Sequence, residues 1–503
     1  MARHHPHLAP AYVADQLDEP ARRDPLGHRL HVLAAAWYFF FAGFPIAFVE
    51  FMAIPLLVIG LIRFRLTYRT MLSFGAQPLF IAVTLWAIWQ ALSLRWSPDP
   101  EQGMRELGNC RWIWVTFMVW PVARARTLLI AALAAGLTCG AASQAVNAIG
   151  HGVGLRSLML TQNLDRNAGW WEPIVGGTLL TAGLGLHLPA AMMGRGHERL
   201  IAAAGAVVML AGVVATGTRG AWIASAGLIG IVGVVAGVRW VFARRTGGTP
   251  NPPNERDSGA DRASDRMFAA HSSMDLQSEV RGTKKHRPLK ATVGGTVGGT
   301  VGMGVAALVV VAVLVWALAG PAIGRRIELA RSDLAAAARG EYRTDTGARL
   351  LMWKWAVREV RARPITGVGA GGFRPWARAH AADFGEDAAT MPLHLHAHSA
   401  PLQIAATTGL VGLALAGLVM GIAIRGGLRE LGPSGHEGAR PGSGLGSYAA
   451  GPGFALVGMA LAGLFDPVHQ TTITGAWLAM LMGLCLVGRP GPTPLSRSLR
   501  VPT

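Results

Sequence analysis

Cysteine and charge are both scarce in this chain, and each shortage excludes a class of protein. The three cysteines, Cys110, Cys139 and Cys485, lie in or beside apolar runs without CxxC spacing, which excludes a disulfide framework and gives no redox motif. Charged residues make up 15% of the sequence and hydrophobic residues 51%, which argues against a set of ordinary soluble domains. Residues 1–30 are polar and lack an apolar core, so no cleavable signal peptide is expected.

Long apolar runs are abundant instead. Runs of about 20 apolar residues recur along the chain, which is typical of polytopic helical membrane proteins. We therefore predict an all-α polytopic membrane protein with about 12 transmembrane helices and both termini cytoplasmic. The expected spans are residues 31–43, 45–62, 78–94, 110–122, 127–149, 172–193, 199–215, 221–242, 294–319, 400–424, 449–465 and 472–488. Residues 31–62 contain Pro45, Glu50 and Pro55, so one long broken helix is an alternative for the first two spans.

These spans divide the chain into seven parts and explain its charge. The parts are a cytoplasmic tail at 1–30, transmembrane helices one to eight at 31–242, a cytoplasmic insert at 243–292, the ninth helix at 293–319, a large outside loop at 320–398, helices ten to twelve at 399–488 and a cytoplasmic tail at 489–503. The insert is rich in Pro, Gly, Ser, Asp and Arg, so we expect it to be disordered. The net charge of +18 follows from Lys and Arg in cytoplasmic loops, and no nucleic-acid partner is needed.

The outside loop is too long and too patterned to be a simple connection. An Ala-rich helical stretch comes first, followed by a helix that Asp345 or Thr346 can cap and that Pro364 ends. Its apolar positions predict an amphipathic helix lying at a membrane surface. These positions are Leu350, Trp353, Val357 and Val360. The stretch "PITGVGAGGF" at 364–373 resembles a phosphate loop, but no strand precedes it and no GK[ST] closes it, so a tight glycine turn is the preferred interpretation.

Three histidines alternate in "LHLHAHSAPLQIAATTGLVGL", residues 393–413, just before the tenth span. An extended segment would place His394, His396 and His398 on one side, whereas a helix would bring His394 and His398 together. A zinc or copper site is one interpretation. An interfacial cluster without chemistry is a second, and a catalytic role is the third.

Several stretches together resemble the O-antigen ligase family. They are "TGTRGAW" at 216–222, an arginine in the outside loop shortly before the pattern "W...A......P..G.G...F", the H.H pair followed by "PLQ" and "GLVGL", and "LSLRWSPDPEQGMREL" at 92–107. The resemblance covers roughly residues 70–485. One position departs from the family, because Ser399 stands where its members usually have Asn after the second His.

The resemblance implies a GT-C-like, metal-independent, inverting glycosyltransferase in the bacterial inner membrane, with its active site facing the periplasm and no cofactor. The implied donor is a glycan linked to undecaprenyl diphosphate, and the implied acceptor is a hydroxyl of a glycolipid such as the lipid A-core. A chain polymerase that extends a growing glycan and a protein O-oligosaccharyltransferase are alternatives within the family. A polysaccharide or lipid transporter or flippase is an alternative of another class. Membrane lipids are the remaining expected partners.

Arg219 is the first candidate for binding the diphosphate. The predicted topology places its turn outside, where the positive-inside rule does not account for it, and the helix that follows presents free N–H groups there. Arginine suits this role because its planar fork binds phosphate oxygens bidentately. Structural anchoring is the alternative. Arg349 matches the family's second arginine, with a solvated helix face as its alternative.

The H.H pair supplies the candidate general base, since a histidine can remove a proton from a hydroxyl near neutral pH. His398 is preferred and His396 remains open, because Ser399 leaves the register of the pair unsettled. Other polar residues of outside loops are candidates for lining the same cleft, with capping or solvation as the alternative. These residues are Asn163, Asp165, Arg166, Asp466 and His469.

Overall fold

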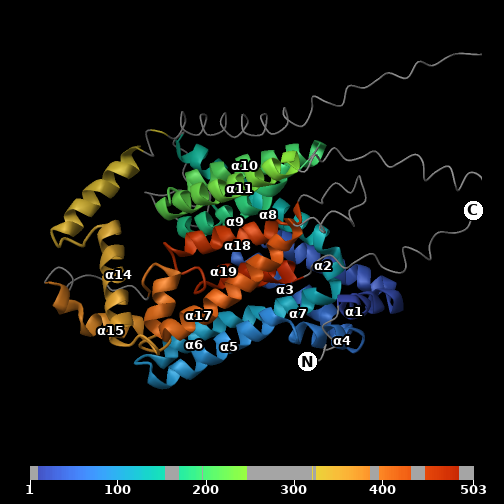
Figure 1. The fold of residues 1–503 in the computed structure, drawn as a ribbon, viewed down its shortest axis with the longest axis horizontal. Helices are drawn as coiled ribbons and strands as arrows, with labels where there is room; N and C mark the ends of the chain where they lie inside the picture. The colour runs from blue at the N-terminus through green and yellow to red at the C-terminus, as the bar shows by residue number, and fades with distance from the viewer. Residues whose placement is uncertain are drawn as a thin grey trace, which may run out of the picture.

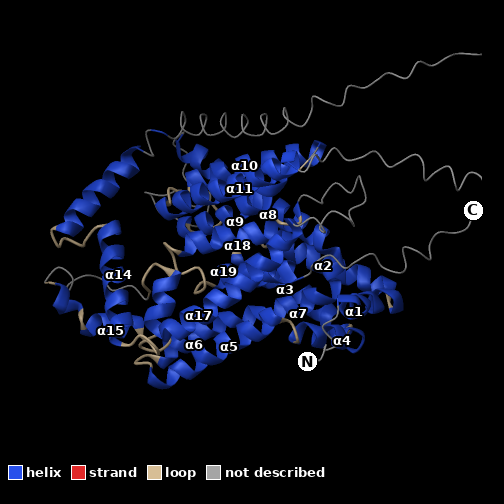
Figure 2. Ribbon diagram, viewed as in Figure 1, coloured by secondary structure: helices blue, strands red, loops and turns tan. Residues whose placement is uncertain are grey.

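The computed structural model describes residues 10–152, 169–194, 196–245, 320, 324–385, 396–431 and 448–486. Every regular element within these ranges is a helix (Figure 2). The larger helices are α1 (Pro10–Arg23), α2 (Pro25–Phe41), α3 (Ile46–Ile62), α4 (Phe64–Gly75), α5 (Pro78–Ser93), α6 (Pro100–Gly108), α7 (Ile113–Val119), α8 (Arg126–Gly152), α9 (Pro173–Met193), α10 (Gly196–Ala215), α11 (Arg219–Arg245), α14 (Asp345–Ala362), α15 (Phe373–Ala379), α17 (Ala400–Leu428), α18 (Gly451–Gly463) and α19 (Thr472–Leu486). Residues 324–338 form a further helix.

Six described helical stretches are long and apolar enough to cross a membrane, or seven if a bent pair counts as one span. The six are Pro78–Trp96, Pro100–Ala148, Pro173–Met193, Gly196–Ala215, Arg219–Arg239 and Ala400–Leu428. The bent pair is α3 with α4, which meet at 103°, and α18 and α19 are apolar but shorter. The chain is therefore a polytopic helical membrane protein, as its composition predicts.

The count of twelve is not reached among the described residues, for identifiable reasons. The predicted span 110–122 and all but the last residue of 127–149 fall within the single candidate stretch Pro100–Ala148. In this stretch α6, α7 and α8 follow one another through 3-10 turns at Asn109–Trp112 and Trp120–Ala125, with a kink at Val122. The predicted span 31–43 corresponds to α2, which has 17 residues. A turn at 42–45 separates α2 from α3, so residues 31–62 do not form one broken helix. The predicted span 294–319 and most of the insert at 243–292 lie outside the described residues.

Helix α9 lies at the centre of the bundle and packs against α8, α10, α11 and α18 (Figure 1). Small residues allow this close packing, as in many membrane helix pairs. A Cβ on Gly185 of α9 would stand 2.6 Å from the backbone of Phe454 in α18. A Cβ on Gly427 of α17 would stand 2.5 Å from Gly453. The glycines along these helices therefore set how near the backbones approach.

Several arginines predicted to be cytoplasmic contact the protein near α1 and α4, which lie at one end of the bundle (Figure 1). Buried Arg63 lies 2.9 Å from the Asp24 carboxylate, and Arg124 lies 2.7 Å from Asp18. Arg126 donates to the carbonyl oxygens of Leu484 at 2.7 Å and Ala449 at 2.6 Å. Several of these arginines therefore hold helices together in addition to carrying charge.

The opposite end of the bundle carries the helix over 324–338, α14 and α15 (Figure 1). If this end faces the periplasm, Ala382→Cys should react with an impermeant thiol reagent in intact cells. Arg69→Cys, an exposed position in α4, should react only after the membrane is opened. The reverse pattern of labelling would invert the topology and remove the basis for an outward-facing site.

Helix α14 packs one face against the protein, and this face differs from the stripe predicted to lie at a membrane surface. Its buried side chains include Leu351, Met352, Trp355 and Ala356, whereas Val357 is 38% exposed. The helix has apolar side chains on more than one side, and packing against α15 and α17 selects the side that is buried. The predicted stripe of Leu350, Trp353, Val357 and Val360 is half-buried or exposed in the structure, and its place at a membrane surface stays a prediction.

Helix α14 ends where the sequence predicts, but it begins at a different capping residue. The N-cap is Thr344, whose Oγ1 accepts a hydrogen bond from the Gly347 N–H at 3.0 Å, and neither Asp345 nor Thr346 takes that place. A Thr side chain in an extended backbone conformation is a favourable cap. The helix ends at Ala362, before Pro364 as predicted.

Candidate functional site

Arg219 is the first residue of α11 and directly follows the turn at 216–218. Gly217 adopts a φ of 63°, which a residue without a Cβ adopts most easily. The Thr218 N–H donates to Thr216 Oγ1 at 3.2 Å, and Thr218 Oγ1 donates to the Pro173 carbonyl at 3.0 Å. These bonds fix the start of α11 at the end of the bundle that carries α14.

A polar triad joins Arg219 to the long loop. Arg219 Nη1 donates to Thr346 Oγ1 at 2.7 Å and lies 3.5 Å from Asp333 Oδ2. Thr346 Oγ1 donates to Asp333 Oδ2 at 2.7 Å. The Arg219 side chain is 25% exposed and that of Asp333 is 11% exposed. Arg219 is thus held in place by two protein groups while part of its guanidinium remains accessible.

Arg349 lies on the same side of α14 as Thr346, because residues three apart on a helix are neighbours. One turn further along, the ring of Trp353 lies 6.5 Å from the ring of Phe465. A Cβ on Gly220 would stand 2.7 Å from the Phe465 Cβ. The loop at 464–471 therefore contacts both the start of α11 and this side of α14.

His398 faces the same loop. Its Nδ1 lies 3.7 Å from Asp466 Oδ1, and the two side chains are 12% and 17% exposed. The His396 and His398 rings lie 4.4 Å apart with an edge-to-face orientation. Among the described residues, His398 is the one non-glycine with a positive φ, at 50°. Such a backbone conformation is costly and is often found where function requires it.

The loop at 464–471 is thus the element around which the predicted residues meet. It contacts Gly220 beside Arg219, Trp353 one turn after Arg349, and His398 itself. The structure therefore brings Arg219, Asp466, His398 and His396 to one end of the bundle. Arg349 joins them by its position on α14.

The stretch at 364–373 forms a tight turn, which is the interpretation that the sequence favours over a phosphate loop. Gly367, Gly369 and Gly371 all have positive φ. The backbone N–H groups that a phosphate would need are used within the protein. Val368 N–H donates to the Ala406 carbonyl at 2.9 Å and Gly369 N–H to that of Thr407 at 2.7 Å. This turn fixes the first part of α17 and thereby the chain that leads to His398.

The remaining candidates lie elsewhere or outside the described residues. His469 lies in the wall of a neighbouring cavity, where its ring is 6.5 Å from that of Trp86. Arg358 pairs with Asp383 at 2.6 Å. Asn163, Asp165, Arg166 and His394 lie outside the described residues, so the three-histidine metal hypothesis is not tested by the part of the chain that the structure covers.

Glu359 is a buried acid within α14 that sequence reasoning did not single out. Burial raises the pKa of its carboxyl above the usual 4.5, and Arg363, 3.8 Å away, offsets this in part. A raised folded-state pKa contributes stability below the unfolded pKa and loses it as the pH rises through the folded value. Glu359→Gln should therefore raise the melting temperature at about pH 8 and leave it nearly unchanged at about pH 4. Exposed Glu341→Gln is the control, and an equal gain at both pH values would contradict the assignment.

Sequence reasoning missed Asp333, Thr346 and Phe465 as members of this site. Asp333 is the one acid within "LARSDLAAAAR", and that isolation was a usable signal. Thr346 was considered only as a helix cap. Phe465 offers no sequence signal beyond its place next to Asp466, because its contact with Gly220 depends on how α11 and α18 pack.

Comparison with known protein families gives one match within the chain. A family model described as O-antigen ligase matches residues 286–417, a segment that contains Arg349, His396 and His398. This match supports membership of the O-antigen ligase family. Arg219 and Asp466 lie outside the matched segment and join the site through the fold. No curated protein sequence matches the chain.

Proposed function

We propose that this chain, as a member of the O-antigen ligase family, transfers a glycan from undecaprenyl diphosphate to a hydroxyl of an acceptor glycolipid. The observation that carries the proposal is the meeting of an arginine at a helix N-terminus with a histidine–carboxylate pair around one loop. The family implies a lipid-linked glycan substrate. The lipid A-core acceptor and the ligase reaction are the finer parts of this proposal.

The arginines act on the donor. A lipid diphosphate leaves with its bonding electrons, so the transition state gains negative charge on the diphosphate oxygens, and preorganised donors stabilise that charge. Arg219 is preorganised by Thr346 and Asp333, and the backbone N–H groups at the start of α11 point in the same direction. Arg349 adds a second positive charge from α14.

His398 acts on the acceptor. Its Nε2 takes the hydroxyl proton as the oxygen attacks the anomeric carbon and the bond to the diphosphate breaks. Asp466, 3.7 Å from Nδ1, stabilises the imidazolium that forms. A single in-line displacement inverts the anomeric configuration. Each group therefore has a separate part, and the chemistry requires neither a nucleotide sugar nor a metal.

Deletion of the gene in its host tests the reaction. A ligase predicts that long lipopolysaccharide bands disappear while the lipid-linked polymer accumulates. Bands that carry a single repeat unit would instead identify the chain polymerase of the same family. Unchanged glycans on both lipids would contradict the proposal and favour the protein-glycosylating or transport alternatives.

A further inference from the structure

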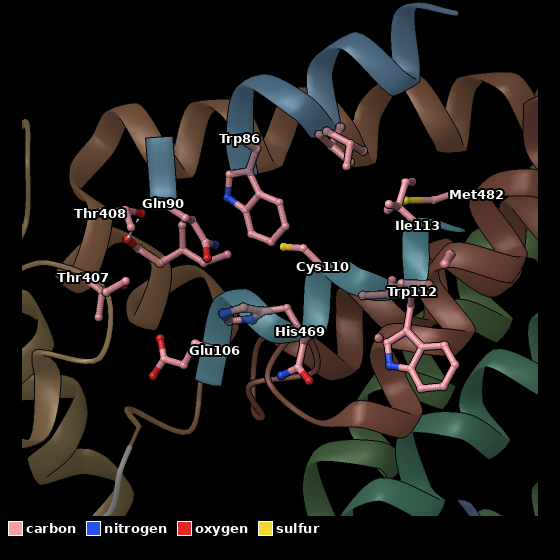
Figure 3. Close-up of a pocket in the computed structure, with 18 residues that line it drawn as sticks. Trp86, Gln90, Glu106, Cys110, Trp112, Ile113, Thr407, Thr408, His469 and Met482 are labelled. Atoms are coloured by element: carbon pink, nitrogen blue, oxygen red, sulfur yellow. Dashed lines mark hydrogen bonds between the residues drawn. The ribbon is translucent and has the colours of Figure 1, made fainter. Parts of the chain in front are cut away.

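A second cavity lies beside the site described above, between α5, α7, α17 and α19, and is called here the α5–α19 cavity (Figure 3). Its volume is about 90 Å³. Neither Arg219, Arg349 nor His398 lines it. The cavity is therefore distinct from the proposed catalytic centre.

The polarity of this cavity changes along its length. Gln90, Glu106 and His469 line one end, and Ile113 and Met482 line the other. The polar end lies under the glycine turn, because Glu106 accepts a hydrogen bond from the Gly371 N–H at 3.3 Å. Val83 lies seven residues before Gln90 on α5, or about 10 Å deeper at 1.5 Å per residue. The lining thus resembles the profile of a membrane amphiphile with its head at the α14 end.

Buried polar atoms in the wall indicate what the head carries. Trp86 Nε1, Trp112 Nε1 and His469 Nδ1 are buried and form no hydrogen bond with any described residue, and the rings of Trp86 and His469 lie 6.5 Å apart. Buried polar atoms in proteins are nearly always satisfied, so atoms of this kind in a cavity wall point to a ligand. A hydroxyl fits both Trp86 and His469, since it accepts from the indole N–H and serves either tautomer of the imidazole.

The charges of the wall exclude an anionic head. Among the described lining residues there is no Lys or Arg, and Glu106 is the one acid. Burial lowers the pKa of His469 to about 4, so this imidazole is neutral near pH 7. A phosphate here would meet a carboxyl group and no cation, which costs free energy in a buried place.

We propose that the α5–α19 cavity, whose volume of about 90 Å³ holds only part of such a molecule, binds one amphiphile at the junction of its head and chain. The uncharged hydroxyl-bearing head lies at Trp86, Gln90, Glu106 and His469, and the first carbons of a single apolar chain are directed toward Met482. This chemistry is that of a glycolipid head with one of its chains. Its source is either the acceptor substrate or a resident membrane lipid. His469 and Asp466 lie on the same loop, so occupancy of the cavity lies next to the partner of His398. The binding site itself does not depend on the proposed transfer reaction.

Photolabelling of the full-length purified protein in phosphatidylglycerol nanodiscs tests the site. The probe is dodecyl β-glucoside with a diazirine in its chain, and the control probe is dodecyl phosphate with the same diazirine. The glucoside should label the cavity segments of α5 or α19 saturably, and unlabelled dodecyl glucoside should compete. Labelling at lipid-facing Ile88, which is 51% exposed, should rise without saturation. Saturable cavity labelling by the phosphate probe, or none by the glucoside, would overturn the proposal.

Variants decide whether Trp86 and His469 bind the head. Trp86→Phe with His469→Phe should weaken saturable labelling by at least about tenfold, because one lost buried hydrogen bond alone can cost about that factor in affinity. The double variant should not lower the melting temperature, because neither removed atom has a hydrogen-bond partner among the described residues. Trp222→Phe is the matched control. It also removes an indole nitrogen, but Trp222 does not line the cavity and its Nε1 has a protein partner, the Val213 carbonyl at 3.1 Å. If the double variant unfolds, Leu478→Trp blocks the apolar end instead. Undiminished labelling in a folded variant would contradict the assignment.

Two further measurements identify the source. If the bound amphiphile is the acceptor substrate, the double variant should raise the KM for the acceptor and leave the KM for the donor unchanged. Dodecyl glucoside should then compete with the acceptor. A resident lipid predicts an unchanged acceptor KM and a co-purified lipid, seen by native mass spectrometry, that the double variant loses. Both results support the site. If the protein does not transfer glycan but still shows saturable labelling of the cavity, the proposed function is refuted and the cavity proposal stands.

Discussion

Arg219→Lys is expected to reduce glycan transfer by about 10²–10³-fold, the loss seen when one preorganised donor to a developing anion is removed. Lysine keeps the positive charge but loses the planar fork that binds phosphate bidentately and that donates to Thr346 at 2.7 Å. The measurement is the rate of transfer from purified lipid-linked glycan, with the amount of folded protein in the membrane measured in parallel. Expression should stay near that of the parent.

The control for this substitution is Arg331→Lys on the neighbouring helix, whose side chain is 75% exposed and pairs with Glu328 at 3.7 Å. Its effect on transfer should be negligible, as for most exposed ion pairs. If Arg219→Ala keeps full transfer activity and only lowers the melting temperature, Arg219 has a structural role alone, which is to hold α11 in place by pairing with Asp333.

Arg349→Ala should also slow transfer, because Arg349 lies on the side of α14 that carries Thr346. The expected loss is in the turnover of the lipid-linked donor, measured beside Arg219→Lys. Full activity in this variant would assign the second phosphate contact to another arginine. Arg343 and Arg358 would then be the next candidates, and Arg358 pairs with Asp383 at 2.6 Å.

The sequence predicts the polar turn at Arg219 and the H.H pair because both signals are local. An arginine that begins a helix after a Thr-Gly-Thr turn is visible without a fold, and so is a histidine pair ahead of an apolar run. Helices α9 and α11 were also predicted within a few residues, since each is one uninterrupted apolar run between polar breaks. These features depend on neighbours in the chain.

The missed features depend on packing between distant segments. Asp333 pairs with Arg219 across more than a hundred positions of sequence, and no periodicity encodes that contact. The side of α14 that packs against the protein depends on distant segments in the same way: Leu350 and Leu351 are adjacent and equally apolar, and packing against α17 buries Leu351. The α5–α19 cavity depends on four helices that are separated in the chain.

His398→Ala is expected to lower transfer by about 10²–10⁴-fold, the usual contribution of a general base. Binding of the lipid-linked donor should persist, because the base acts on the acceptor while the arginines hold the donor. Asp466→Asn should lower kcat by a smaller factor and leave the KM for the donor unchanged, since Asp466 acts through His398 at 3.7 Å. Transfer kinetics and donor binding measured on the same preparations separate these effects.

His394→Ala is the matched control, because it removes an imidazole of the same segment that lies outside the H.H pair. It should transfer at nearly the parental rate, and the parent should remain active in excess EDTA. A metal site predicts the opposite result: loss on chelation, recovery with zinc or copper, and equal dependence on all three histidines. His396→Ala distinguishes the two members of the pair, and a deeper loss there than in His398→Ala would assign the base to His396. Transfer that persists in the His396→Ala, His398→Ala double variant would refute the histidine base and leave Asp466 as the nearest ionisable group on the loop at 464–471.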